Sequence, residues 1–272
     1  MNVFQDKIVL ITGASSGIGR ETALQLAKQG ARLALASRKR DTLEELAREI
    51  RKHSEPLVVP TDVTAAEQCR HMVETTVNHF GKLDALINSA GLSMRGWFED
   101  SQIPALEKVM QVNFFGTMYA THYAIPHIKE SRGSLVAISS LTGKRGIPSY
   151  AMYGATKFAI QGLYEAIRIE LAAAGVHVGI VSPGFVATPL RDNVLKPDGT
   201  VWEEPPKPPF RIRPVEQCAR LVVHLLKHRR KEALLPWFIG PLLTIDNMVG
   251  GWLGDRWLGR HFQEPDSPSE QE

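Results

Sequence analysis

The 272-residue sequence predicts an α/β protein built as a single doubly wound domain around a mainly parallel sheet of seven strands. Short apolar runs alternate along the chain with longer amphipathic stretches, and this alternation calls for parallel strands joined by right-handed helical crossovers. The short runs are apolar throughout, which is typical of a sheet that helices cover on both faces. The chain contains no internal repeat and no linker before residue 190, so we expect one domain over residues 1–262.

The first two strand-helix units are marked by clear start and stop residues. Ile8–Thr12 is rich in β-branched residues and leads through a glycine-rich turn into a helix over Ile18–Gln29, which Gly30 ends. Arg32–Ala36 is the second expected strand. The segment Asp41-Thr-Leu-Glu44 then carries a capping-box pattern, so we expect Asp41 to cap the second helix.

The remaining strands and helices follow the same pattern. Further strands are expected at Leu57–Pro60, Leu83–Asn88, Leu135–Ser139, Val176–Ser182 and Ala233–Pro236. Helical stretches are expected to include Ala65–Phe80, Val109–Glu130 and Pro148–Ala174. Gly81 and Gly175 end the first and last of these helices, since glycine readily takes the left-handed conformation of a C-terminal cap.

Three segments outside this pattern have a distinctive composition. Seven prolines fall between Pro189 and Pro214, which predicts a long ordered loop over a site (residues 189–214) rather than a second domain. Residues 237–262 form an aromatic-rich extension that holds three of the five tryptophans. Residues 263–272 form a polar tail that we expect to be frayed.

Composition and charge exclude several classes of protein. Hydrophobic residues make up 43% and charged residues 22% of the chain, as in soluble globular proteins. The net charge of +3 and the lack of a long basic run give no support to nucleic-acid binding. Cys69 and Cys218 lie far apart and predict reduced thiols, and the first strand begins by Lys7, without room for a signal peptide. We therefore expect a cytoplasmic protein without a membrane-spanning helix.

The glycine-rich turn after the first strand predicts a dinucleotide site. In Thr12-Gly-Ala-Ser-Ser-Gly-Ile-Gly19, Gly13 allows a tight turn, Gly17 lets a pyrophosphate approach the backbone, and Gly19 lets the helix pack closely on the strand. The helix that follows offers unpaired amide donors and a positive dipole end to the phosphates. The alternative is an ordinary glycine-rich turn, but its place between the first strand and the first helix favours cofactor binding.

A phenol and an ammonium group share one helix face in Tyr153-Gly-Ala-Thr-Lys157. A cation at roughly 4 Å from the phenol would favour the phenolate by about 4 kcal/mol, enough to bring a tyrosine pKa from about 10 to near 7. The pair is therefore a candidate proton-transfer device. By itself it also fits a solvated helix face, so its neighbours in the sequence decide between the two.

Those neighbours make the sequence resemble the short-chain dehydrogenase/reductase family. The motifs Thr12-Gly-x-x-x-Gly-x-Gly19, Asn88-Ser-Ala-Gly91 and Tyr153-x-x-x-Lys157 occur in the family's order and spacing. Ser140, thirteen residues before Tyr153, and Pro183-Gly184 extend the likeness, which covers residues 7–188. The second motif departs from the family's Asn-Asn-Ala-Gly, because Ser89 replaces the second asparagine.

The resemblance implies a Rossmann fold, a nicotinamide dinucleotide, and a role for each matching residue. Asp62 and Val63 would contact the adenine, and Thr188 the nicotinamide amide, although a turn or N-cap role remains open for Asp62. The full set of expected cofactor-binding residues is Gly13, Ser15, Ser16, Gly17, Ile18, Gly19, Ser37, Arg38, Asp62, Val63, Asn88, Ala90, Gly91, Tyr153, Lys157, Pro183, Gly184, Val186 and Thr188.

The end of the second strand favours NADP(H) over NAD(H). An acidic residue that accepts hydrogen bonds from the ribose is usual there in NAD-binding domains, whereas this chain has Ser37 followed by Arg38, Lys39 and Arg40. A guanidinium binds a 2′-phosphate through charge-assisted hydrogen bonds, and a carboxylate repels it. Asp41 competes for the ribose role, but its position fits helix capping better.

The expected catalytic residues are Ser140, Tyr153, Lys157 and Asn113. Ser140 and Ser139 both end a strand at the carboxyl edge of the sheet, and the family spacing selects Ser140 to bind the substrate oxygen beside Tyr153. By resemblance, Tyr153 donates or accepts the proton, Lys157 stabilises the phenolate and binds the ribose, and Asn113 holds a water of the proton relay. A structural role in the helix is the alternative for Asn113. No residue pattern predicts a metal site.

The substrate side is less determined by the sequence. Expected contacts come from Leu92, Ser93, Met94, Ile147, Tyr150 and the apolar residues Val186, Leu190, Val194, Trp202 and Phe210 of the proline-rich region. These predict a hydrophobic ketone or alcohol, unless they only anchor the loop. The residues of 237–262 predict packing, a subunit contact or a helix on a membrane surface. By resemblance we also expect a homodimer or homotetramer paired through the helices of 109–130 and 148–174.

We therefore expect an NADP(H)-dependent oxidoreductase that interconverts a secondary alcohol and a ketone or aldehyde. An NAD-dependent enzyme of the same family is the first alternative. A non-catalytic dinucleotide-binding protein is the second.

Overall fold

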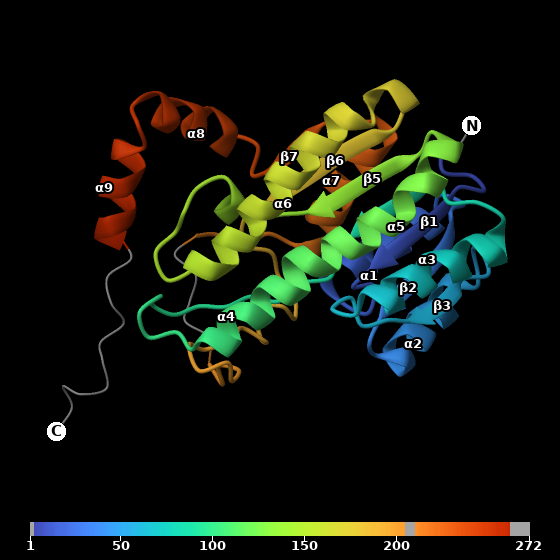
Figure 1. Cartoon of the computed structure of the whole chain (residues 1–272), viewed down its shortest axis with the longest axis horizontal. Coiled ribbons are helices and arrows are strands. Elements are labelled where there is room, and N and C mark those ends of the chain that lie inside the picture. Colours follow the sequence, from blue (N-terminus) through green and yellow to red (C-terminus); the bar gives the residue numbers. More distant parts are fainter. Residues whose placement is uncertain (1–2, 205–209, 262–272) are drawn as a thin grey trace.

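The computed structural model describes residues 3–204 and 210–261, and within them seven strands form one parallel sheet (Figure 1). The strand order is β3-β2-β1-β4-β5-β6-β7, which confirms the doubly wound architecture that the sequence predicts. The strands are β1 (Ile8–Thr12), β2 (Arg32–Ser37), β3 (Leu57–Pro60), β4 (Ala85–Asn88), β5 (Ser134–Ile138), β6 (His177–Pro183) and β7 (Glu232–Leu235). The chain order reverses between β1 and β4, and ligands of such sheets bind at that point, beyond the carboxyl ends of the strands.

Helices cover both faces of the sheet. They are α1 (Gly17–Ala27), α2 (Arg40–Ile50), α3 (Ala66–Phe80), α4 (Ile103–Met110), α5 (Gly116–Ser131), α6 (Ala151–Glu170), α7 (Val215–Lys227), α8 (Ile239–Met248) and α9 (Trp252–His261). Short helical turns η1 (Gln111–Phe115), η2 (Leu141–Gly143) and η3 (Ala172–Ala174) join or extend them. In Figure 1, α3, α5 and α6 lie on the near face of the sheet.

Two apolar clusters form the core, one on each face. Neighbouring residues of a strand point to opposite faces, so Leu10 and Ile11 of β1 enter different clusters although both are fully buried. Ile11 belongs to the cluster that contains Leu26 of α1, and Leu10 to the one that contains Tyr164 of α6. This two-sided burial explains why the strands are apolar throughout. Cys69 is free and buried, as expected.

The start of α2 differs from the expected capping box. The helix begins at Arg40, and Lys39 holds the cap position without a side-chain hydrogen bond. Ser37 Oγ instead accepts a hydrogen bond of 3.2 Å from the Lys39 amide. Because the helix begins one residue before Asp41, that carboxylate lies in the first turn, where it interacts favourably with the helix dipole but does not cap.

The helical stretch around residues 109–130 is also not a single α-helix. The π-helical turn η1 separates α4 from α5 and contains Asn113, whose side chain is fully buried. Widened turns of this kind often occur at functional sites. Here the turn directs Asn113 toward the loop that follows β4, as the hydrogen bonds described below show.

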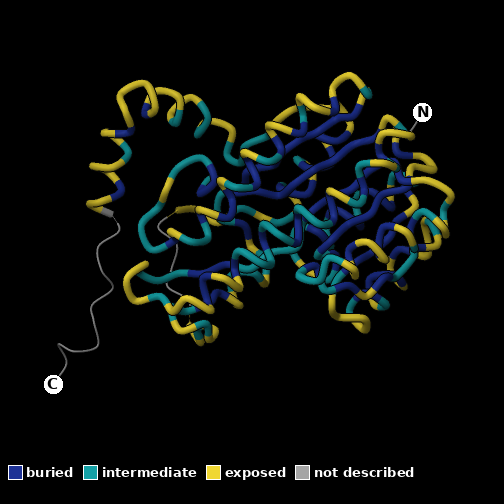
Figure 2. Tube along the Cα trace, in the orientation of Figure 1, coloured by how far each residue is buried: buried dark blue, intermediate teal, exposed yellow. Residues whose placement is uncertain are grey.

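The segment after β7 forms an arm that stands out from the body of the domain (Figure 1). We define this C-terminal arm as residues 237–261, which contain α8 and α9. Much of the arm is coloured as exposed in Figure 2. Its exposed apolar side chains include those of Trp237, Leu242 and Met248. No helix in residues 3–204 and 210–261 has the length and apolar character needed to cross a membrane. The polar tail predicted at 263–272 lies outside the described residues.

Candidate active site

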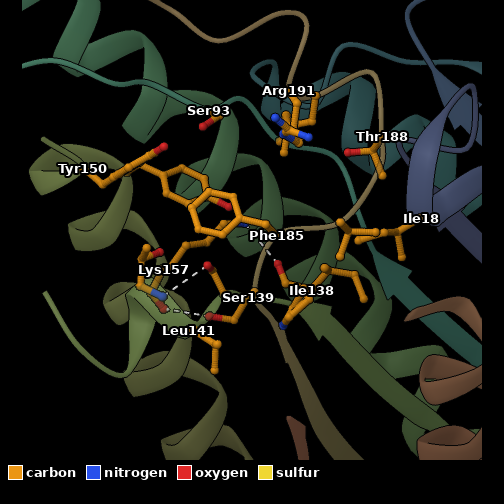
Figure 3. A pocket seen from close by; sticks show the side chains of 18 of the residues that line it. Ile18, Ser93, Ile138, Ser139, Leu141, Tyr150, Lys157, Phe185, Thr188 and Arg191 are labelled. Carbon is orange, nitrogen blue, oxygen red and sulfur yellow. Dashed lines mark hydrogen bonds between the residues drawn. The ribbon is translucent and has the colours of Figure 1, made fainter. Parts of the chain in front are cut away.

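A large cavity lies beyond the carboxyl ends of the central strands. Its volume is about 1420 Å³, larger than the pockets of roughly 300–1,000 Å³ that hold most small ligands. Its wall combines the β1–α1 turn, the ends of the next strands, the first turns of α6 and the C-terminal arm. Figure 3 shows the part of this cavity around Lys157, Ser139 and Phe185. The cavity has room for a dinucleotide and a second molecule.

The β1–α1 turn forms one end of the cavity, and its glycines are required by close backbone contacts. Gly13 has a φ of 68°, and a Cβ there would lie 2.7 Å from the Ala90 backbone. A Cβ on Gly19 would lie 2.5 Å from the Gly13 carbonyl oxygen. These contacts agree with the tight turn and close helix packing that the spacing predicts.

The first turn of α1 lines the cavity and has no side-chain cap. Ser16 caps the helix without a side-chain hydrogen bond, and Ser15, Ser16, Gly17 and Ile18 all line the cavity. An uncapped helix N-terminus offers donors and a positive partial charge to an anion. Thr188 closes this end, because its side chain lies 3.2 Å from where a Gly17 Cβ would be. The turn therefore fits the pyrophosphate of a dinucleotide.

Basic residues stand where β2 ends. Ser37, Arg38 and Lys39 line the cavity, and the side chains of Arg38 and Lys39 are exposed. Among the described residues, no acidic side chain forms an ion pair with either cation. A phosphate near this rim would therefore meet two available positive charges.

Asp62 and Val63 line the cavity after β3, and Asp62 also forms a turn. Its Oδ1 accepts hydrogen bonds from the Thr64 amide at 3.0 Å and from Thr64 Oγ1 at 2.8 Å. The turn role left open by the sequence is thus present in the structure. It leaves the neighbouring backbone at the cavity wall, so an adenine contact remains sterically compatible with it.

Asn88 lies behind the cavity wall rather than in it. Its Nδ2 donates to Thr121 Oγ1 at 3.0 Å and to the Tyr164 hydroxyl at 2.9 Å, and the residue is buried. Thr12 Oγ1 accepts hydrogen bonds from the amides of Ser89 and Ala90. This network fixes the end of β4, so Asn88 positions Ala90 and Gly91, which do line the cavity. Gly19 likewise lies behind the wall.

Two serines end β5 with different contacts. Ser139 Oγ donates to the Lys157 carbonyl oxygen at 3.2 Å, a bond drawn in Figure 3. Ser140 Oγ accepts from the Thr142 amide at 3.1 Å and also forms a hydrogen bond with Tyr153. The structure therefore places Ser140 beside the phenol, whereas Ser139 supports the helix that carries it.

Burial dominates the ionisation of Tyr153 and Lys157. It raises the pKa of Tyr153 to about 12, although the hydrogen bond with Ser140 acts in the opposite direction. Burial also lowers the pKa of Lys157 to about 8. Lys157 Nζ donates to the Ile138 carbonyl oxygen at 3.0 Å and lies 5.5 Å from the centre of the Tyr153 ring. The expected lowering of the phenol pKa is therefore not found, because desolvation outweighs attraction at that distance.

Asn113 links three elements behind the site. Its Oδ1 accepts from the Leu92 amide at 2.7 Å, while its Nδ2 donates to the Leu92 carbonyl at 2.9 Å and to Thr156 Oγ1 at 3.1 Å. The side chain thus ties η1 to the loop after β4 and to α6. A Cβ on Gly91 would lie 3.2 Å from Asn113 Oδ1 and 3.8 Å from Lys157 Nζ, so both side chains lie close to Gly91.

The region after β6 closes the remaining side of the cavity. Pro183, Gly184, Val186 and Thr188 line it, as expected of cofactor-binding residues. Val186 is buried and forms a parallel bridge with Arg213, at the end of the proline-rich region. Residues 205–209, within that region, lie outside the described residues.

The substrate side combines expected and unexpected residues. The predicted residues Leu92, Ser93, Ile147, Tyr150, Val186, Leu190, Val194 and Phe210 line the cavity. Met94 is buried behind the wall, and Trp202 Nε1 donates to the Arg95 carbonyl at 3.2 Å, so Trp202 anchors the loop instead.

The C-terminal arm also forms part of the cavity wall, which the sequence did not indicate. Leu242, Leu253 and Leu258 line the cavity, and Trp257 stacks on Phe210 with ring centres 5.5 Å apart. The arm is held by Arg145, which forms ion pairs with Asp246 at 3.3 Å and Asp255 at 2.7 Å. The many aromatic residues in this segment indicated that it packs against something. Their spacing in the sequence did not show which residues of the domain they contact.

Together, the doubly wound sheet, the glycine turn at β1 and the Ser140, Tyr153 and Lys157 cluster define a Rossmann-like domain with these three side chains in one cavity. The family model described as short chain dehydrogenase matches residues 7–198. The chain belongs to this family, and the resemblance seen in its motifs is confirmed.

Curated plant proteins show the same relationship. The chain is 44% identical to an 11-beta-hydroxysteroid dehydrogenase-like protein (type 3) of Arabidopsis thaliana over 187 residues, 68% of this chain and 60% of that protein. It is 36% identical to 11-beta-hydroxysteroid dehydrogenase 1A of the same plant, over 85% of this chain and 69% of that protein. The chain thus spans about 60% of the length of the first of these relatives.

A solved structure is similar over most of its length. It is an alcohol dehydrogenase from the archaeon Thermococcus sibiricus, complexed with 5-hydroxy-NADP. The TM-score is 0.73 at 26% identity, and the match covers 85% of this chain and 96% of that one.

Proposed function

We propose that this chain is an NADP(H)-dependent oxidoreductase that interconverts a secondary alcohol and a ketone or aldehyde. The observation that carries the proposal is the convergence of Ser140, Tyr153 and Lys157 on the cavity that the first turn of α1 also faces. Relatives named hydroxysteroid dehydrogenases and a structural neighbour named alcohol dehydrogenase, complexed with a modified NADP, support the same chemistry. The large, partly apolar cavity supports a hydrophobic substrate.

Each member of the cluster has a role that its position allows. Ser140 Oγ donates a hydrogen bond to the substrate oxygen and holds that oxygen next to the Tyr153 hydroxyl. Tyr153 gives its proton to that oxygen in reduction and takes it back in oxidation. Lys157 stabilises the phenolate that forms when the proton leaves. Asn113 acts behind them by fixing Leu92 and α6. The nicotinamide, when bound, supplies or accepts the hydride.

Replacement of Tyr153 by Phe tests the proton-transfer role. It removes only the hydroxyl, so we expect carbonyl reduction to fall by about 100-fold or more while NADPH binding is retained. Turnover is measured by NADPH absorbance over a panel of steroids, retinal, sugars and ketones, and binding by NADPH fluorescence. A variant that keeps near-wild-type turnover would exclude Tyr153 as the proton donor. Binding of NADPH without turnover of any compound would favour a non-catalytic dinucleotide-binding protein.

The residues after β2 support NADP(H) rather than NAD(H). Arg38 and Lys39 present exposed positive charge at the cavity, and neither has an acidic partner among the described residues. In the variant Arg38→Asp, we expect the dissociation constant of NADPH to rise about 10- to 100-fold and that of NADH to change little. The two constants are compared by fluorescence titration. Equal losses for both cofactors would contradict the phosphate assignment.

The C-terminal arm supports a second proposal, which concerns contact of the protein with a membrane surface. Its outer apolar side chains include Trp237, Met248 and Trp252, which are 77%, 80% and 59% exposed. We propose that they rest on a membrane surface, where such side chains leave water. Vesicle flotation of the full chain and of a Trp237→Ser, Met248→Ser, Trp252→Ser variant tests this, and equal flotation would contradict it.

Pairing of subunits through α5 and α6 also stays a proposal, to be measured by light scattering.

A further inference from the structure

We propose that the substrate is an amphipathic anion, whose carboxylate or similar head group binds Arg191 beside Tyr150 while its carbonyl or alcohol carbon lies at Tyr153. This inference rests on the proposed oxidoreductase function and adds the chemical class of the substrate. Nine of the described residues that line the cavity are Lys or Arg, and two are Asp.

The roles assigned above account for four of these nine cations. Arg38 and Lys39 fit a cofactor phosphate, and Lys157 belongs to the proton-transfer cluster. Arg145 is paired with Asp246, and the other aspartate, Asp62, is held by its turn. Five cations remain without such a role: Arg95, Lys108, Arg191, Arg211 and Arg213.

Arg191 is the best placed of these cations to bind an anion. It is partly buried, it lines the cavity, and no described acidic side chain forms an ion pair with it. Its positive charge opposes the rise in the pKa of Tyr150 that burial causes, so the guanidinium lies within electrostatic range of that ring. In Figure 3, Arg191 lies across Phe185 from Lys157. An anion at Arg191 would therefore lie apart from the reacting carbon.

A second guanidinium lies on the same ring. Arg95 forms a hydrogen bond with Tyr150, and its carbon atom Cζ lies 5.6 Å from the ring centre. The Tyr150 ring is in turn 6.4 Å from that of Tyr153. Tyr150 thus stands between the cations and the proton donor, and sets the separation between the head group and the reacting carbon. A guanidinium binds a carboxylate by paired hydrogen bonds, which a neutral group cannot reproduce.

The rest of the wall is apolar, so the expected ligand is not a small hydrophilic anion. Phe185 stacks on Phe210 at 6.0 Å, and Phe210 stacks on Trp257 at 5.5 Å. Leu258 is buried in a cluster with Tyr150. A hydrophobic body would cover these surfaces and gain the free energy of their burial. The juxtaposition of aromatic stack and guanidinium groups favours a molecule with both features, such as an oxo-fatty acid.

The test compares acids with their uncharged esters. Oxo-fatty acids of increasing chain length, and the methyl ester of each, are reduced with NADPH by the full chain. We expect the acids to have the higher kcat/KM, with an optimum chain length. In Arg191→Gln, the KM of the best acid should rise about 10- to 100-fold. The ester should change little, and Arg191→Lys should recover part of the loss. Arg220→Gln, in an exposed arginine of α7 outside the cavity, is the matched control.

The competing role for Arg191 is a contact with a cofactor phosphate. The dissociation constant of NADPH is therefore measured by fluorescence for each variant. Weaker NADPH binding by Arg191→Gln, with the preference for acid over ester unchanged, would overturn the proposal. So would a wild-type protein that reduces esters as well as acids, although the proposed oxidoreductase function would then stand.

Binding without turnover separates the two proposals. Decanoate and decanol are titrated into the NADPH-bound protein, with tryptophan fluorescence as the readout because Trp257 lines the cavity. We expect tighter binding of decanoate, lost in Arg191→Gln and weakened by added salt. If this holds while no carbonyl compound is reduced, the anion site stands and the proposed activity fails. Equal binding of the two ligands would overturn the anion site.

Discussion

At the scale of single residues, burial and charge oppose each other at Lys157. The side chain is only 5% exposed, yet its ammonium is the charge that the proposed chemistry needs. In the folded protein, the described hydrogen bond of Nζ is the one to the Ile138 carbonyl. One such bond does not replace the water molecules that solvate an exposed ammonium group. The lowered pKa of Lys157 is the consequence. A catalytic site that holds a poorly solvated charge lowers the stability of the fold.

Replacement of Lys157 by Met should therefore stabilise the protein while it abolishes turnover. The native pKa of Lys157 is about 8 and the ordinary value is 10.5, so the protonated side chain destabilises the wild-type fold below about pH 8. The gain in the variant should be on the order of 3 kcal/mol at neutral pH. It should shrink between pH 8 and 10.5, where wild-type stability rises because the unfolded chain binds more protons.

Urea unfolding followed by circular dichroism at a series of pH values measures this gain. Glu165→Gln is a suitable control for a general effect of charge, because Glu165 is an exposed residue of the same helix. A Met variant that is less stable than wild type at pH 7 would contradict the argument.

At the scale of elements, a buried hydrogen-bond network joins β4 to α5 and α6. The Tyr164 hydroxyl lies 2.9 Å from both Asn88 Nδ2 and Thr121 Oγ1, and Tyr164 is fully buried. The network holds two helices against the strand whose end carries Ala90 and Gly91. The three residues come from three elements, so their hydrogen bonds fix the positions of these elements relative to one another.

Replacement of Tyr164 by Phe should lower the free energy of unfolding by about 1–3 kcal/mol, because Asn88 and Thr121 would each lose a buried partner. Denaturant unfolding measures the loss. The variant Tyr119→Phe, on α5, provides a comparison for loss of a tyrosine hydroxyl that takes no part in these hydrogen bonds. No change in Tyr164→Phe relative to that control would show that the network contributes no net stability.

The sequence predicted elements better than it predicted how elements meet. Apolar runs of β-branched residues located the strands, and Gly81 ended α3 as predicted, with a positive φ. The helix predicted at 148–174 is shorter: α6 ends at Glu170, and Gly175, also with a positive φ, caps the short turn η3 that follows. The π-helical turn at Asn113 was not predictable from periodicity, because it depends on hydrogen bonds to Leu92, far along the chain. The contribution of the C-terminal arm to the cavity was missed for a similar reason. Its place depends on Arg145, and nothing in the local sequence identifies that partner.

The same distinction holds within the site. Motif spacing indicated Gly13, Ser140 and Tyr153, because their positions follow directly from a strand end or a helix face. The pKa of Tyr153 was not predictable, since it depends on how much protein surrounds the phenol. Arg191 lies in the irregular region after β6, where no periodicity relates residue number to direction.

At the scale of the whole molecule, one carboxylate joins two central strands at their amino ends. Asp84 Oδ2 accepts a hydrogen bond from the Ile8 amide at 2.9 Å, and the carboxylate pairs with Lys7 at 3.1 Å and Lys82 at 2.8 Å. Burial alone would raise the pKa of Asp84, but the Ile8 amide and the two ammonium groups lower it overall. Asp84 therefore holds β1 and β4 together at the amino ends of the strands.

Replacement of Asp84 by Asn should lower stability at neutral pH by about 1 kcal/mol or more. A depressed native pKa contributes stability that is present above the unfolded value of 3.8 and lost as pH falls through the native value. The difference between wild type and Asp84→Asn should accordingly shrink as the pH falls below about 4. Thermal unfolding across the acid range measures it, and a difference that does not change with pH would contradict the ionic role. Asp192→Asn, in an exposed residue without a described ion pair, is the control.

The connection between Arg145 and the arm has a consequence for how this protein could change over evolutionary time. The family match ends at residue 198, while the arm, which lines part of the cavity, begins at residue 237. The proposed proton-transfer residues and the arm's part of the cavity wall thus occupy separate stretches of the chain, and Arg145 ties the arm to the loop after Ser140. Mutations in the arm could give new substrates without disturbing the reaction, provided that they keep the two aspartates that Arg145 binds. Exchange of arms among relatives would then be a short route to new specificities.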